Sequence, residues 1–146
     1  MVANCYPACP EPNLSLGMPP HSDYGLLTIL IQSQSGLQIM DHNNNGHPVP
    51  IIEAALLVGD QIEVMSNGRY KSVLHRATLN KKAHGFQLSA FISLPLEKKV
   101  GPAPELADED HPLAYNEGSI GGFLDCIYGD DITKQRRYID ALEINP

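Results

Sequence analysis

Short apolar runs separated by turn-forming residues dominate the first 95 positions of the chain. The runs are rich in aliphatic and β-branched residues, as strands are, and they cover residues 25–32, 36–40, 51–58 and 86–94. The asparagine-rich stretch at residues 41–46 is typical of a turn. Because many short strands recur at this spacing, the pattern predicts an antiparallel sandwich or barrel.

The stretch between the third and fourth runs is interpreted as a hairpin. Residues 61–65 alternate polar and apolar side chains, as a half-buried strand does. Ser66-Asn67-Gly68 is typical of a tight turn, and residues 69–76 then form a second strand. The pattern therefore predicts that His75 lies at the end of a strand.

The last third of the chain has a helical pattern. Residues 102–105, Pro-Ala-Pro-Glu, predict an extended connector, and residues 119–128 place apolar side chains at helical spacing. A final helix, capped by an aspartate at 130 or 131, is expected to carry Ile132, Tyr138, Ile139 and Leu142. We expect one domain, with a β core in residues 1–100 and the connector and helices of the same domain in residues 101–146.

Composition excludes several functional classes. A formal net charge of −7 without a basic stripe argues against a nucleic-acid partner. The longest apolar run is strand-sized, so no membrane span is expected. The three cysteines, Cys5, Cys9 and Cys126, fit no disulfide framework, and no secretory signal is visible. The sequence therefore predicts a cytoplasmic protein with reduced thiols, and we expect a monomer.

Three residues have the types of a metal-binding set: His21, Asp23 and His75. Two imidazoles and one carboxylate form the facial set of non-haem Fe(II) oxygenases, which leaves metal positions open, whereas a structural zinc site has four ligands. On an extended backbone, residues two apart point to one face, and Pro19-Pro20 favours that backbone. A His-x-Asp tripeptide alone is a weak signal, and a lone histidine is more often a hydrogen-bonded structural residue than a ligand. That interpretation is kept for His42, His47, His84 and His111.

The flanking motifs strengthen the metal-site hypothesis. Asn4-x-Tyr6-Pro7, His21-Ser22-Asp23-x-Gly25, Gly36-Leu37-Gln38 and Val58-Gly59-Asp60 occur in order, followed by His75-Arg76-Ala77. Together they resemble the plant 2-oxoglutarate- and Fe(II)-dependent dioxygenases. The tail, including the Asp125-Cys126-Ile127-Tyr128-Gly129 segment, is similar to the flavanone 3-hydroxylase-like and downy-mildew-resistance-like branch.

The resemblance implies a mainly β fold with a double-stranded β-helix, or cupin-like jelly roll, followed by C-terminal helices. It further implies that the chain corresponds to the C-terminal portion of a family member and lacks the N-terminal helical region. His21, Asp23 and His75 match the iron ligands, and no catalytic residue is expected beyond them. Asn4 and Tyr6 match the pair that lines the 2-oxoglutarate site, although Tyr6 also fits a core aromatic. The implied activity is hydroxylation or oxidation of a small, flavonoid-like plant metabolite, with ascorbate as reductant.

One motif of the family is missing. The family anchors the distal carboxylate of 2-oxoglutarate with Arg-x-Ser, and the arginine position, ten residues after His75, is Gly85. The serine position is Gln87, and a shift of two residues recovers Ser89 but no arginine. A neutral residue cannot replace the bidentate guanidinium clamp, and losing a charged partner in a buried site costs about 2–5 kcal/mol.

Three functions remain open at this point. The chain is an active oxidoreductase of this family, or a non-catalytic or impaired homologue that keeps the metal site but lacks the clamp. A cupin-like binding module with an adventitious triad is disfavoured by the ordered motifs.

Overall fold

The computed structural model describes residues 1–51, 54–129 and 137–144. The chain divides into two compact units. The first comprises Met1–Ser22, Thr28–Leu57 and Val73–Phe91, and the second comprises Asp23–Leu27, Val58–Ser72 and Ile92–Pro146. No helix in the described ranges is long and apolar enough to cross a membrane.

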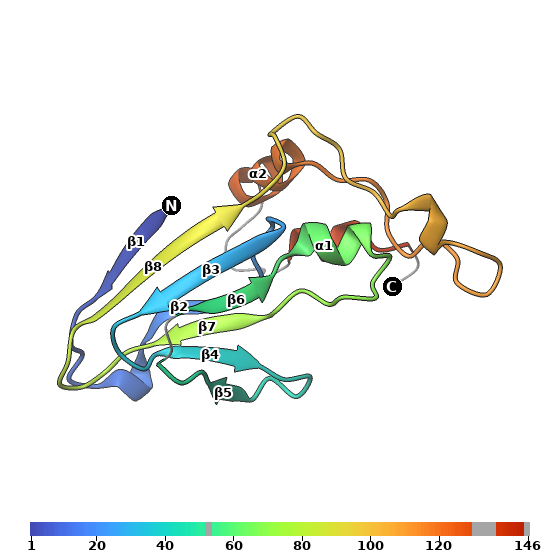
Figure 1. The fold of residues 1–146 in the computed structure, drawn as a ribbon. Helices are drawn as coiled ribbons and strands as arrows, with labels where there is room; N and C mark the ends of the chain where they lie inside the picture. The colour runs from blue at the N-terminus through green and yellow to red at the C-terminus, as the bar shows by residue number, and fades with distance from the viewer. Residues whose placement is uncertain (52–53, 130–136, 145–146) are drawn as a thin grey trace. The chain divides into compact units, whose positions relative to one another are not determined.

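The first unit contains two four-stranded sheets (Figure 1). One has the order β1 (Val2–Tyr6), β8 (Gly85–Ile92), β3 (Leu27–Gln32), β6 (Ala55–Val58). The other has the order β2 (Leu16–His21), β7 (His75–Thr78), β4 (Leu37–Met40), β5 (Gly46–Pro48). Consecutive strands alternate between the two sheets, except for the β4–β5 hairpin, and this is the winding of a double-stranded β-helix. The mainly β fold predicted from the sequence is confirmed.

The period-2 pattern of β3 and β8 explains why these residues form strands. In β3, Leu30 is buried while its neighbours Ile29 and Ile31 are exposed. In β8, Gln87 and Ser89 are buried and Phe86 is exposed. Successive side chains of a strand point to opposite faces, so the inner face of β8 is polar, which is unusual for a sheet core.

In its described residues, the second unit contains the helices α1 (Asp60–Met65) and α2 (Ile120–Gly129), together with two short 3₁₀ turns, η2 (Pro104–Leu106) and η4 (Tyr138–Ala141). Its core consists of Val64, Val100, Tyr115, Ile139 and Leu142. The predicted helix at residues 119–128 is confirmed as α2.

The predicted strand at residues 61–65 is wrong, because this segment is helix α1. Gln61, Glu63 and Val64 are all buried. In a strand, the adjacent residues Glu63 and Val64 would point to opposite faces, so they could not both lie on one buried face. Backbone N–H groups at the start of the helix donate to earlier carbonyls, Asp60 to Asp23 at 2.8 Å and Gln61 to Gly25 at 3.1 Å. These contacts, and not the local pattern, decide the helix.

Several boundaries also differ from those expected. Strand β7 begins at His75, so residues 70–74 are not strand, and Ser66-Asn67-Gly68 turns the chain out of a helix, with positive φ at Asn67 and Gly68. The connector contains the 3₁₀ turn η2. The segment around Tyr138, expected to be α-helical, is the 3₁₀ turn η4, and residues 130–136 of the expected final helix lie outside the described residues.

Candidate metal centre

His21 and His75 are brought together by strand pairing. Strand β2 pairs with β7 in antiparallel register, and His21 lies directly opposite His75. The centroids of the two rings are 4.3 Å apart, with the ring planes at 52°. The side chains are 54 residues apart in sequence, so the register of one pair of strands creates this contact.

Both imidazoles are oriented by the same kind of hydrogen bond. Nδ1 of His21 lies 2.8 Å from the carbonyl oxygen of Pro19, and Nδ1 of His75 lies 2.9 Å from that of Val73. Since a carbonyl only accepts, each Nδ1 carries the proton and donates it. In the neutral form of such a ring, Nε2 carries the lone pair that a metal needs, and hydrogen bonds of this kind are typical of metal-binding histidines.

Asp23 completes the group. One ligand atom from each of His21, Asp23 and His75 lies within 4.8 Å of the other two. Ligands bound at about 2.1 Å to one ion are at most about 4.2 Å apart, so small side-chain rotations suffice to hold an ion. His75 is buried, and the other two residues are half-buried. The donor set, two neutral imidazoles and a carboxylate, suits Fe(II), so the residues fit this metal.

Sequence reasoning missed the residues that support Asp23. The Asp23 carbonyl accepts the hydrogen bond from the Asp60 N–H. A Cβ at Gly59 would lie 2.8 Å from the same carbonyl oxygen and still closer to that of Gly25. The Gly59-Asp60 motif was visible as a turn, and its close approach to residues 23–25 is the reason for the glycine.

Asn4 and Tyr6 lie opposite the positions of the missing clamp. In the β1–β8 register, Asn4 faces Gln87 and Tyr6 faces Gly85. Burial raises the pKa of the Tyr6 phenol, and a hydrogen bond with the Asn4 side chain partly offsets this effect. The structure therefore joins these four residues in one cross-strand cluster.

The pocket beside this cluster does not fit the distal carboxylate of 2-oxoglutarate. Its volume is about 10 Å³, room for about one water molecule. Its lining is uncharged and consists of Tyr6, Gln34, Ser35, Gly36, Thr78, Asn80, Gly85, Phe86 and Gln87. Within this lining no cation is available to bind a carboxylate.

Two of the remaining histidines make the side-chain contacts expected of structural residues. His47 pairs with Asp41 at 2.9 Å and His111 with Asp108 at 3.1 Å, both near the surface. In the described part of the chain, His21, Asp23 and His75 are the one group of three or more histidine, cysteine, aspartate or glutamate residues that could hold a metal ion.

Comparisons with known proteins agree with this geometry. Residues 1–93 match the 2OG-Fe(II) oxygenase superfamily. The chain is 40% identical over 147 residues to "Flavanone 3-dioxygenase 3" of Oryza sativa subsp. japonica, which covers 99% of this chain and 45% of that protein. It is 40% identical over 116 residues to "Protein DMR6-LIKE OXYGENASE 1" of Arabidopsis thaliana, covering 78% of this chain and 33% of that protein. The chain thus spans less than half the length of these curated relatives.

Solved structures show the same fold. The crystal structure of JOX2 in complex with 2OG, Fe and JA has a TM-score of 0.77 and 34% identity, covering 84% of this chain and 37% of that chain. The rice dioxygenase for auxin oxidation has a TM-score of 0.80 and 26% identity, covering 97% of this chain and 50% of that chain. The expected jelly roll and the expected branch are confirmed, and the chain belongs to the 2OG-Fe(II) oxygenase superfamily.

Proposed function

We propose that this chain holds Fe(II) at His21, Asp23 and His75 and is the iron-binding core of a dioxygenase. Two observations carry the proposal: each histidine donates from Nδ1 to a backbone carbonyl, and one ligand atom from each of His21, Asp23 and His75 lies within 4.8 Å of the other two. Three protein ligands leave adjacent positions on an octahedral ion for other ligands.

The proposed reaction is the 2-oxoglutarate-dependent hydroxylation of a small plant metabolite. Bound iron would supply the activation of O2, with ascorbate as the reductant that keeps it ferrous. The chain's own residues would orient the ligand nitrogens, keep water from the buried side of His75, and present the Asn4 and Tyr6 side chains to the cosubstrate.

A flavonoid-like substrate is proposed from the relatives alone. Several of them are named as flavanone dioxygenases or flavonol synthases. We further propose that the protein acts as a cytoplasmic monomer, as expected from its composition.

A second candidate is a homologue that binds metal without efficient turnover. The observation that favours it is the neutral lining at Gly85 and Gln87, opposite Tyr6 and Asn4. Without a cation, a buried carboxylate loses a charge-assisted partner, and this lowers affinity by about 30-fold or more.

The metal site is tested by anaerobic titration with Fe(II), followed calorimetrically. Wild-type protein is expected to bind one ion, and His75→Ala is expected to weaken binding by at least about 100-fold. His47→Ala is the matched control, because His47 is exposed, lies on β5 and pairs with Asp41. Equal affinity of the wild type and His75→Ala would refute the site.

Turnover is tested separately, with Fe(II), ascorbate and 2-oxoglutarate, by quantifying succinate with and without flavanones. Succinate production that His75→Ala abolishes supports the active oxygenase. A chain that binds Fe(II) but forms no succinate supports the second candidate.

A further inference from the structure

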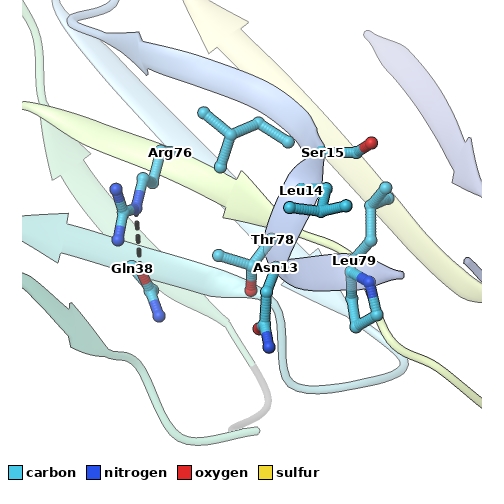
Figure 2. Close-up of a pocket in the computed structure, with 9 residues that line it drawn as sticks. Asn13, Leu14, Ser15, Gln38, Arg76, Thr78 and Leu79 are labelled. Atoms are coloured by element: carbon cyan, nitrogen blue, oxygen red, sulfur yellow. Dashed lines mark hydrogen bonds between the residues drawn. The ribbon is translucent and has the colours of Figure 1, made fainter. Parts of the chain in front are cut away.

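A second pocket lies against the β2-β7-β4-β5 sheet, beside Arg76 of β7 (Figure 2). In β7, His75 and Ala77 are buried, whereas Arg76 and Thr78 point to the other face. The pocket has a volume of about 750 Å³, within the usual range for small-molecule sites. It is lined by Pro12, Asn13, Leu14, Ser15, Leu16, Gln38, Arg76, Thr78 and Leu79.

The Arg76 side chain in this pocket is held in place. Its Nε donates a 2.7 Å hydrogen bond to Oε1 of Gln38, the residue opposite it in the β4–β7 register. Gly46 on β5 makes room for the pair, because a Cβ there would lie 2.8 Å from Nη2 of Arg76 and would also collide with the Gln38 amide oxygen. The guanidinium is therefore oriented in advance, which reduces the entropy lost on binding.

Arg76 has no carboxylate partner in the described part of the chain. Gln38 is its one hydrogen-bond partner there, and none of the ion pairs includes it. The pocket lining contains no acidic residue, although the whole chain carries a net charge of −7. The terminal nitrogens of the guanidinium thus remain available for an anion.

The wall of the pocket across from Arg76 combines aliphatic side chains with a few polar groups. Leu14 is 78% exposed and Leu16 is 48% exposed, so their carbons are accessible to a ligand. Ser15, Thr78 and Asn13 add hydroxyl and amide groups. In Figure 2, Arg76 and Gln38 lie on one side, and Leu14, Asn13 and Leu79 lie across from them.

We propose that this pocket binds a small organic carboxylate with an apolar, hydroxyl-bearing body. The carboxylate pairs with Arg76, which can accept it in bidentate geometry. The body lies against Leu14, Leu16 and Leu79, and its hydroxyl group bonds to Ser15 or Thr78. This site is separate from the triad. His75 of the triad and Arg76 of the pocket are adjacent residues of one strand, so their side chains point to opposite faces of the sheet.

The experiment measures binding of 4-hydroxycinnamate to the metal-free protein by titration calorimetry at low ionic strength. We expect one site with a Kd below about 1 mM. Arg76→Gln is expected to weaken binding by about tenfold or more, because the charge-assisted hydrogen bonds are lost. Arg69→Gln, at an exposed arginine outside the pocket, should leave the Kd unchanged.

Two further variants and two further ligands make the test specific. Gly46→Ala should weaken binding by displacing the Gln38–Arg76 pair, and Leu14→Ser should weaken it without affecting folding, because Leu14 is exposed. The methyl ester of the ligand should bind at least about tenfold more weakly, and inorganic phosphate should not compete at equal concentration. An unchanged Kd in Arg76→Gln, equal binding of the ester, effective competition by phosphate, or no binding at several millimolar would each overturn the proposal.

Discussion

His21 and His75 face each other across the β2–β7 strand pair, and each holds the carbonyl two residues before it through Nδ1. The two hydrogen bonds are alike in geometry, at 2.8 Å and 2.9 Å. Both rings therefore present the same tautomer, and the strand register sets the spacing of their Nε2 atoms. Because backbone atoms make these contacts, the arrangement tolerates changes in the surrounding side chains.

Removing the charge of Asp23 should weaken metal binding without unfolding the protein. In Asp23→Asn, a neutral amide replaces the carboxylate, and amides are poorer ligands for a divalent ion. We expect Fe(II) affinity to fall by about tenfold or more in calorimetric titration. Asp125→Asn, at an exposed position of α2, is the control, and equal losses in both variants would contradict the assignment.

Adding a methyl group at Gly59 should destabilise the protein. Its backbone is extended, so alanine is allowed there, but the Cβ would collide with the carbonyls of Asp23 and Gly25. Overpacking of this kind costs about 1–3 kcal/mol, which urea denaturation of Gly59→Ala would measure. In Gly121→Ala the nearest atom is Ser119 Oγ at 3.6 Å, so this variant should be neutral or slightly stabilised. If both variants unfold at the same urea concentration, the steric argument fails.

The buried Glu63 carboxylate should stabilise the second unit in a pH-dependent way. Burial raises its pKa, but hydrogen bonds from Lys71 at 2.8 Å, the Ser72 N–H at 2.7 Å and Tyr115 at 2.7 Å outweigh burial, and the pKa lies below 4.5. A depressed pKa adds stability above the unfolded-state pKa, and that stability is lost as pH falls through the folded-state pKa. Glu63→Gln should therefore cost about 1.5–3 kcal/mol at pH 7.

The difference between wild type and Glu63→Gln should shrink as the pH is lowered below 4.5. Urea unfolding at a series of pH values would measure it. Glu117→Gln is the matched control, because its contact with Lys99 is 3.9 Å long and both side chains are exposed. This control should change stability by no more than about 0.5 kcal/mol. A pH-independent loss in Glu63→Gln would mean that the carboxylate contributes through packing alone.

Restoring an arginine at position 85 should create affinity for 2-oxoglutarate. The nearest atoms to a Cβ at Gly85 are 3.9 Å away, the Cβ atoms of Gln34 and Tyr6, so the strand accepts a side chain there. Gly85→Arg is expected to raise 2-oxoglutarate affinity by about tenfold or more, measured calorimetrically with Co(II) bound at the triad. Leu88→Arg is the control, since residue 88 is exposed on the opposite face of β8 and does not line the pocket beside Gly85. A gain shared by both variants would indicate only a nonspecific effect of added positive charge.

The strands and the metal ligands could be predicted because their signals are local. Apolar runs rich in aliphatic and β-branched residues predicted β3 and β8, and the spacing of two residues on an extended backbone placed His21 and Asp23 on one face. The family motif marked Gly85 and Gln87 as the positions of the missing clamp, and the structure has them opposite Tyr6 and Asn4.

Other features depended on contacts distant in sequence. The alternation at residues 61–65 indicated a strand, yet Gln61 and Glu63 are buried in helix α1. Oε1 of Gln61 accepts a hydrogen bond from the N–H of Leu94, 33 residues away, and Glu63 accepts one from the Tyr115 hydroxyl, 52 residues away. A local pattern treats a polar residue as exposed, and only tertiary partners permit its burial.

The sequence by itself determined which residues can hold a metal, since ligand chemistry belongs to the side chains. Tertiary structure decided that His75 meets His21, because a strand register is a long-range choice among pairings. It also decided the pocket at Arg76, since neither the Gln38 partner nor the room left by Gly46 follows from neighbouring residues. Residue types define the available chemistry, and the packing of strands from distant segments decides which groups act together.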